Sequence, residues 1–262
     1  MTIRRRSLAA GLVLLVLLSA CSNEPEATPE TPGPQASGSS VPSLPPSRSD
    51  SARCSNQAAA VGSGRVAGGE VSGDVDGDGS DDVVFVVRDE SSPPGCQTFL
   101  VAETAEGVLS TPTEEPDIAY ALQAPRVNSL AQIDGDGGLE ILVDLEQGAS
   151  TQFLGMFKVE SGALQKVRIG GGSAYGDLFP YGGSVGHIEA SNCAETPGAD
   201  VLIASATPNA TDYTIRTVLY EMRETTLVPL PRSEQPPIST GPDVELREGF
   251  DSSPFGDCAT SP

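Results

Sequence analysis

Apolar residues along the chain gather in short runs that contain many β-branched side chains and are bounded by glycine, proline or serine. Runs of this kind predict β-strands, whereas a sustained spacing of about three to four residues would predict helices. No stretch beyond residue 53 keeps a convincing helical spacing. The predicted fold class is therefore all-β, with strands expected at 82–88, 97–102, 107–110, 140–145, 151–159, 163–169, 200–204, 213–223 and 227–230.

The predicted strands recur with a period of 58 to 60 residues. The stretch 73–82, GDVDGDGSDD, comes just before one apolar strand, and the similar stretch 132–140, QIDGDGGLE, comes before another. A third stretch, 189–200, lacks the glycine pattern but still places an acidic residue before its strand. With the strand that leads into each acidic stretch, every unit has four strands, the content of one propeller blade. Such a period predicts an array of one repeated unit.

The first acidic stretch carries four aspartates, Asp74, Asp76, Asp78 and Asp82, at positions 1, 3, 5 and 9 of a tight loop. These carboxylates repel one another unless a cation neutralises them, and oxygen ligands at sharp, glycine-rich bends are what calcium prefers. An EF-hand is not supported, because Phe85 stands at position 12 and the flanking segments are not helical. A surface turn without metal is the alternative, since aspartate and glycine also favour turns.

The motif D-x-D-G-D-G-x-x-D followed by an apolar strand resembles the FG-GAP/VCBS repeats of integrin α-subunit propellers and of many bacterial exported proteins. In that family the loop joins the first two strands of a blade and binds calcium. The resemblance implies a small β-propeller-like array of about three to four blades with calcium-binding loops. Closure through strands at 55–61 and 243–250, an open array, and a ring completed by a partner all fit the spacing. Carried over to this chain, the first calcium site consists of side-chain oxygens of Asp74, Asp76, Asp78 and Asp82 and the backbone carbonyl of Ser80.

The second acidic stretch matches the motif at fewer positions. Gln132 replaces the first aspartate, which lowers the charge of the site, and the third stretch is not expected to hold a metal. The resemblance implies that the ligands of a second calcium ion are Asp134, Asp136, Glu140 and the backbone carbonyl of Gly138.

The N-terminus reads as an export signal. Residues 1–20 contain three arginines, an apolar run too short to span a bilayer and a small-residue end, which is the layout of a secretory signal peptide. The sequence LSAC at 18–21 resembles a bacterial lipobox, which predicts lipidation of Cys21; an ordinary signal peptide with a chance cysteine is the alternative. Residues 21–53, rich in proline and serine, predict a disordered tether, followed by one folded domain at 54–262. The expected location is the outer face of the cell membrane.

Charge and cysteine content fit an exported protein. Removal of residues 1–20 leaves 12 basic against 36 acidic residues, a formal charge of −24, which argues against nucleic acid as a partner. The four remaining cysteines predict two disulfides with three possible connectivities, free thiols being the alternative. We favour the pairs Cys54–Cys96 and Cys193–Cys258, because each brackets one unit of the repeat.

The sequence predicts a ligand surface only weakly. The glycine-rich stretch 170–183 carries Tyr175, Phe179 and Tyr181, which would present aromatic rings to a glycan or protein, or would simply connect two units. His187, the single histidine, is expected to be structural, because no nucleophile motif surrounds it. The expected function is a calcium-binding, non-enzymatic adhesion or envelope-interaction module, anchored through its lipid and binding an envelope glycan or protein. The alternatives are a glycan-active hydrolase or lyase, and an accessory subunit of an envelope complex.

Overall fold

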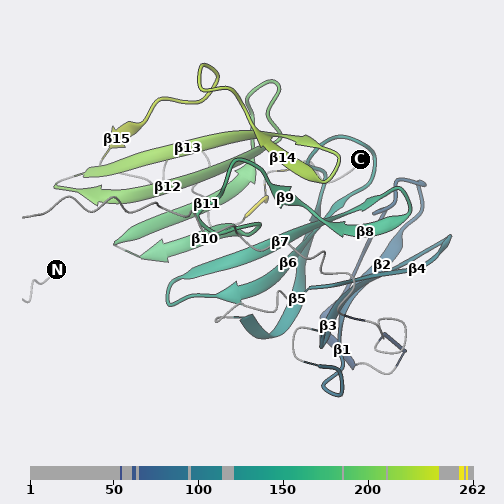
Figure 1. Cartoon of the computed structure of the whole chain (residues 1–262). Helices are drawn as coiled ribbons and strands as arrows, with labels where there is room; N and C mark the ends of the chain where they lie inside the picture. Colours follow the sequence, from purple (N-terminus) through teal and green to yellow (C-terminus); the bar gives the residue numbers. More distant parts are fainter. Residues whose placement is uncertain are drawn as a thin grey trace, which may run out of the picture. The chain divides into compact units, whose positions relative to one another are not determined.

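The described residues form fifteen β-strands, which the computed structural model arranges in two sheets (Figure 1). All of them belong to the unit Arg48–Pro262. The all-β prediction is confirmed, because every strand expected from the sequence overlaps at least one strand of the structure. The residues described are 54, 61–62, 65–93, 96–113, 121–184, 186–210, 212–241, 254–256 and 258.

Several predictions concern residues outside this description and stay predictions. They are the signal peptide at 1–20, the lipidated Cys21, the tether at 21–53, and the closing strands at 55–61, where only Val61 is described, and at 243–250. Within the described part of the chain, no helix has the length and apolar character needed to cross a membrane.

The first sheet is an antiparallel meander of four strands, β1 (Arg65–Gly73), β2 (Asp82–Arg88), β3 (Thr98–Thr104) and β4 (Gly107–Pro112). β2 and β3 are apolar at nearly every central position because both of their faces are covered. Val84, Val86 and Leu100 belong to a core shared with the second sheet. The alternate residues Phe85 and Val87 pack on the other face, near Cys54 and Cys96.

The second sheet contains the remaining eleven strands. They are β5 (Ala121–Ala131), β6 (Glu140–Gln147), β7 (Thr151–Glu160), β8 (Ala163–Lys166), β9 (Arg168–Ile169), β10 (Phe179–Ser184), β11 (His187–Cys193), β12 (Val201–Asn209), β13 (Asp212–Arg223), β14 (Thr226–Pro229) and β15 (Ser239–Gly241). The order is β5-β6-β7-β10-β11-β12-β13-β14-β9, with β8 paired to β7 and β15 paired to β13. All pairings are antiparallel except that of β14 with β9.

The repeat seen in the sequence is visible as three groups of four consecutive antiparallel strands, β1–β4, β5–β8 and β11–β14. In each group an acidic stretch joins the first strand to the second. The unit of the repeat is therefore the one that the sequence predicts.

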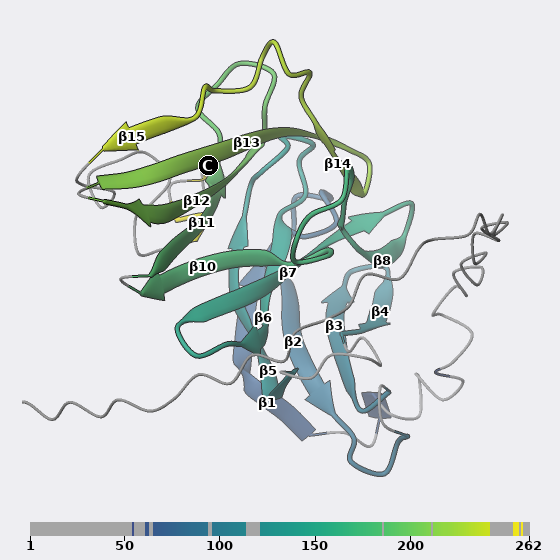
Figure 2. The ribbon, with the colours of Figure 1, turned by 60° about the vertical axis from the view of Figure 1, so that its left-hand side comes forward.

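The array of separate propeller blades is not confirmed. β10 pairs with β7 on one side and with β11 on the other, so the second and third groups form one continuous sheet (Figure 2). β7 is long enough to serve two partners, because Thr151–Leu154 pair with β10 while Phe157–Glu160 pair with β8. Neither sheet closes on itself within the described residues, and the number of blades is not confirmed.

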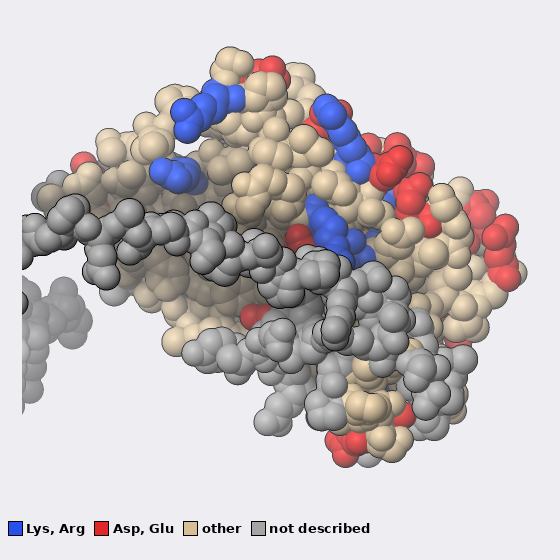
Figure 3. Space-filling view, viewed as in Figure 1, with Lys and Arg blue, Asp and Glu red and all other residues tan. Residues whose placement is uncertain are grey.

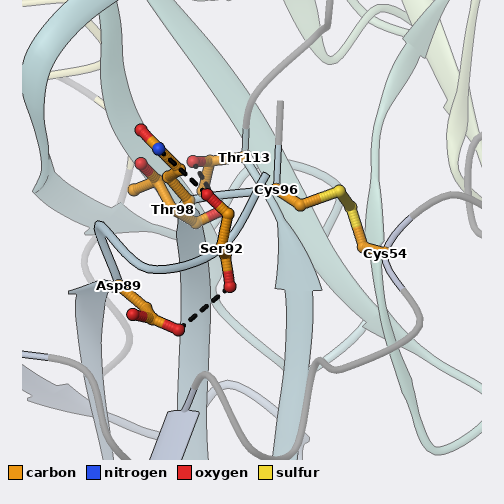
Figure 4. Close-up of a disulfide and its surroundings, with 7 residues drawn as sticks. Cys54, Asp89, Ser92, Cys96, Thr98 and Thr113 are labelled. Carbon is orange, nitrogen blue, oxygen red and sulfur yellow. Dashed lines mark hydrogen bonds between the residues drawn. A yellow bond between two sulfur atoms is a disulfide. The ribbon is translucent and has the colours of Figure 1, made fainter. Parts of the chain in front are cut away.

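Two disulfides join the cysteine pairs that the repeat favours. Cys54 is bonded to Cys96, which precedes β3, and the bond lies beside the sheet face of the first unit (Figure 4). Cys193 at the end of β11 is bonded to Cys258. The second bond holds Phe255, 3% exposed, against the buried ring of Phe179, with ring centroids 5.7 Å apart.

Replacing both Cys193 and Cys258 by serine is expected to lower the free energy of unfolding by about 2–4 kcal/mol, because the unfolded chain gains freedom and Phe255 loses its attachment. Urea unfolding of the oxidised proteins measures this difference. An unchanged midpoint, at an unchanged slope, would contradict a stabilising role for the disulfide.

Candidate metal sites in the acidic loops

The first acidic loop, 74–81, joins β1 to β2 and is organised by its own first aspartate. Asp74 Oδ1 accepts hydrogen bonds from the N–H groups of Gly77 (2.7 Å) and Asp78 (3.1 Å), and Asp74 Oδ2 accepts one from Gly79 (2.8 Å). Gly77 and Gly79 have φ angles of +78° and +87°, in the left-handed region that favours glycine. The loop sequence thus winds the backbone around one carboxylate.

Two further carboxylates converge on the first. Asp74, Asp76 and Asp78 each offer an oxygen, and these oxygens lie within 4.8 Å of one another. Asp76 Oδ1 accepts from the N–H of Asp78 (3.2 Å), and Asp78 Oδ1 accepts from the N–H of Ser80 (2.7 Å). Each of these two side chains keeps a second oxygen that can face an ion.

An oxygen of Asp82 gives the strongest indication of a bound cation. Its side chain is buried, with the residue 1% exposed, and Oδ2 accepts a hydrogen bond from the N–H of Val75 (2.9 Å), whereas Oδ1 has no partner among the described residues. Burial raises the pKa of Asp82, the Val75 hydrogen bond opposes the rise, and the charges of Asp76 and Asp78 add to it. A buried carboxylate oxygen without a partner is costly, and a bound cation would satisfy it.

No basic side chain among the described residues balances the charge of the first loop. Of the ion pairs in the described part of the chain, none involves Asp74, Asp76, Asp78 or Asp82. The atoms that could bind a metal are all oxygens on a partly exposed loop. This is the ligand set that a hard divalent cation prefers. The residues of this loop therefore fit calcium.

The second acidic loop, 132–139, joins β5 to β6 and repeats the backbone plan of the first. With its amide oriented to satisfy both neighbours, Gln132 accepts from the N–H of Gly137 (3.2 Å), as Asp74 accepts from Gly79. Its amide nitrogen donates to the carbonyl of Gly138 (2.8 Å), which is one of the predicted calcium ligands. Gln132 thus takes over the structural role that Asp74 has in the first loop, but it carries no charge.

A lysine enters the second loop from β7. Lys158 Nζ forms an ion pair with Asp134 Oδ2 and another with Asp136 Oδ2 (3.2 Å). The side chains of Lys158 and Asp134 are only 7% and 6% exposed. The predicted ligands Asp134 and Asp136 are therefore close together, but around an ammonium group, and they do not fit a calcium ion while Lys158 stays there.

Glu140 repeats the unusual state of Asp82. The residue is fully buried, Oε2 accepts from the N–H of Ile133 (2.8 Å), and Oε1 has no partner among the described residues. Burial raises the pKa of Glu140 to about 8; the charge of Asp134 adds to this rise, while the Ile133 hydrogen bond and the charge of Lys158 oppose it. The ninth position of both loops thus carries a buried acid with one free oxygen.

The third acidic stretch, between β11 and β12, uses its carboxylate differently. Asp200 Oδ2 accepts a hydrogen bond from the N–H of Met222 (2.6 Å), and the N–H of Asp200 donates to the carbonyl of Tyr220 (2.8 Å). The side chain of Asp200 therefore links β12 to β13.

The first two loops contact each other directly. The N–H of Leu139 donates to the carbonyl of Asp74 (2.9 Å), so the second loop is hydrogen-bonded to the backbone of the first proposed calcium ligand. A Cβ atom at Gly138 would lie 2.8 Å from the carbonyl oxygen of Val75, and one at Gly77 would lie 3.3 Å from the nitrogen of Gly138. Glycine at these positions lets the two sheets meet at their acidic loops.

The aromatic residues of the glycine-rich stretch do not form one ligand surface. Phe179 is fully buried in β10 and belongs to the core, so its proposed exposure to a ligand is wrong. Tyr175 is 36% exposed, packs on Phe153 with centroids 5.4 Å apart, and donates through its hydroxyl to Glu189 Oε1 (2.9 Å). Of the three aromatic residues, Tyr175 is the one with an appreciably exposed ring.

Tyr181 belongs to a polar cluster that the sequence analysis missed. Its hydroxyl donates to Asp144 Oδ1 (2.9 Å) and also lies in close polar contact with the side-chain amide of Gln152. Asp144, 3% exposed, also accepts from Arg126 Nε (2.9 Å) and Asn128 Nδ2 (3.2 Å). Burial raises the pKa of Tyr181, and Asp144 raises it further.

Two signals could have pointed to the residues that were missed. Lys158 is a charged residue within a strand of otherwise mostly apolar residues, and Asp144 stands in a similar position within β6. Charged residues in buried strands need partners.

His187, expected to be structural, lies at the start of β11 with Nε2 2.8 Å from Thr151 Oγ1.

Comparison of the chain with protein-family models, with curated proteins and with solved structures finds no match. The function proposed for the chain accordingly rests on its own loops, their contacts and their sequence motif.

Replacing Gly138 by alanine is expected to lower the free energy of unfolding by about 1–3 kcal/mol, because the added Cβ would push against the backbone of Val75. Thermal unfolding measures the change. Gly186→Ala is the matched control, since its Cβ would meet nothing closer than Ser184 Oγ at 3.7 Å. Equal melting temperatures for the two variants would contradict the close approach of the loops.

Replacing Tyr181 by phenylalanine is expected to destabilise the fold by about 1–3 kcal/mol, because buried Asp144 loses one of its donors. Tyr213→Phe serves as control, since the Tyr213 hydroxyl makes no hydrogen bond within the described residues. Chemical unfolding of both variants tests the difference. Wild-type stability of Tyr181→Phe would contradict a stabilising role for its hydroxyl.

Proposed function

We propose that this protein is an extracytoplasmic, calcium-binding β-module, in which one calcium ion binds the first acidic loop and holds the two sheets together there. The observation that carries the proposal is the buried Asp82 Oδ1, which has no partner among the described residues; Asp82 is the first residue of β2 and directly follows the loop in which oxygens of Asp74, Asp76 and Asp78 converge. Calcium would supply the missing positive charge.

The ligands proposed are all oxygens. Side chains of Asp74, Asp76, Asp78 and Asp82 would bind the ion, together with the backbone carbonyl of Ser80. The hydrogen bonds from the N–H groups of Gly77, Gly79 and Ser80 hold the carboxylates in place before the ion arrives. Because the loop is hydrogen-bonded to Leu139 in the loop that leads into β6 of the second sheet, its ion would act on the junction between the sheets.

The resemblance to FG-GAP/VCBS repeats supports the same proposal. In both cases an acidic loop with the D-x-D-G-D-G-x-x-D motif joins the first two strands of a four-stranded unit. We propose that the three units of this chain are blade-like relatives of such repeats, arranged as a small propeller-like array in which β10 bridges the second and third units.

The proposed location is the outer face of the cell membrane, with the protein held by a lipid on Cys21 and a tether at 21–53. The two disulfides support an oxidising compartment, where such bonds persist. Calcium is plentiful outside cells, so a site with a dissociation constant on the order of 0.1–1 mM would be filled there.

The proposed work of the module is non-enzymatic binding of an envelope glycan or protein. The strongly acidic charge and the dispersed basic side chains on the face shown in Figure 3 support a partner other than nucleic acid. Tyr175, exposed and fixed by Glu189 and Phe153, is the aromatic group we propose for contact with that partner.

Addition of calcium to the chelated protein is expected to raise its melting temperature by roughly 5–10 °C when calcium exceeds the dissociation constant about 100-fold. Asp76→Asn/Asp78→Asn is expected to abolish the shift, because it removes two ligand charges. Differential scanning calorimetry in calcium and in chelator makes the measurement.

The control for this experiment is Asp81→Asn/Glu106→Gln, which removes the same charge from two exposed positions outside the proposed ligand set. It should keep the full calcium shift. An equal melting temperature with calcium and with chelator in the wild type, or an equal loss of the shift in both double variants, would contradict the site.

A further inference from the structure

The second acidic loop carries acidic side chains at three of the same positions as the first, but the ammonium group of Lys158 lies among them. Asp134, Asp136 and Glu140 stand 58 residues after Asp76, Asp78 and Asp82. Glu140 even repeats the buried free oxygen of the ninth position. Glu140 is 0% exposed as a whole residue. Its free oxygen indicates a loop of the metal-binding type rather than an ordinary turn.

The strand registers show why the two loops differ. Val83 of β2 pairs with Glu103 of β3, and Ile141 of β6 pairs with Phe157 of β7. One residue further toward the acidic loop, the third strand carries Thr104 in the first unit and Lys158 in the second. Equivalent positions thus present an uncharged residue to one loop and an ammonium group to the other.

Two side chains already bind oxygen atoms that a calcium ion would need as ligands. Lys158 Nζ binds the Asp134 and Asp136 carboxylates, and the Gln132 amide donates to the carbonyl of Gly138. A calcium ion requires about six to eight oxygen ligands, so it cannot share this set with an ammonium and an amide N–H. The Lys158 side chain is buried. The Gln132 amide is held by its hydrogen bonds within the loop.

We propose that Lys158 is a built-in cation that takes the place of the metal ion in the second loop, and that Gln132 closes the remaining carbonyl position. The loop is therefore folded without metal, and calcium expected there from the sequence is excluded. This inference goes beyond the proposed function, because it concerns a loop that the proposed ion does not enter. It predicts that removing both residues opens a second metal site.

The test uses the purified protein with its first loop disabled by Asp76→Asn/Asp78→Asn, and it uses calcium alone as the probe. In this background, isothermal titration is expected to detect no calcium binding while Lys158 is present. Further substitution of Gln132→Asp/Lys158→Thr is expected to create one site per chain. Its melting temperature should then rise by about 5 °C in excess calcium.

The matched control is Gln132→Asp/Lys166→Thr in the same background, which changes the net charge equally but keeps Lys158. It is expected to bind no calcium. Binding in the control would show that Lys158 does not exclude the ion, and would overturn the proposal.

Two other results would also overturn it. One is stoichiometric calcium binding by the background protein, a measurement that does not depend on how the altered second loop folds. The other is a folded Gln132→Asp/Lys158→Thr variant that binds none. Failure of the wild-type protein to bind calcium would instead refute the proposed function, since the second loop is measured with the first one disabled.

Discussion

The structure depends on the neutralisation of negative charge where the two sheets meet. The hydrogen bond from Leu139 to Asp74 and the close packing of Gly138 on Val75 bring two acidic loops into direct contact. Carboxylates at such a junction repel one another and lose hydration, so a cation or a proton at each loop would stabilise the junction.

The two loops satisfy the condition in different ways. The second contains Lys158, whose charge is part of the chain, and Glu140, whose pKa of about 8 leaves it largely protonated near neutral pH. The first has no basic partner among the described residues and fits an ion from solution. At the junction, the second loop is therefore neutralised by the chain itself, whereas neutralisation of the first loop would depend on an ion from solution.

Local patterns predicted much of this arrangement. Apolar runs bounded by turn residues located the strands, the D-x-D-G motif located the loop where three aspartates converge, and the repeat gave the pairing of Cys54 with Cys96 and of Cys193 with Cys258. β10 was missed because its glycines read as a loop. The burial of Phe179 depends on Phe255, far along the chain, and the direction of Lys158 depends on the register of β6 with β7. A charged residue in an apolar strand indicates that Lys158 needs a partner, but only these long-range contacts decide which partner it has.

The bridging strand β10 has a consequence for how this domain can change in evolution. In a linear array of independent repeats, whole units can be duplicated or deleted, because each contacts only its neighbours through similar surfaces. Here the second and third units share an unbroken ladder of hydrogen bonds through β7, β10 and β11. Insertion of another unit between them would leave two open sheet edges. A new unit next to the separate first sheet, or after the third unit, would leave this ladder intact, so the second and third units would be inherited as one piece.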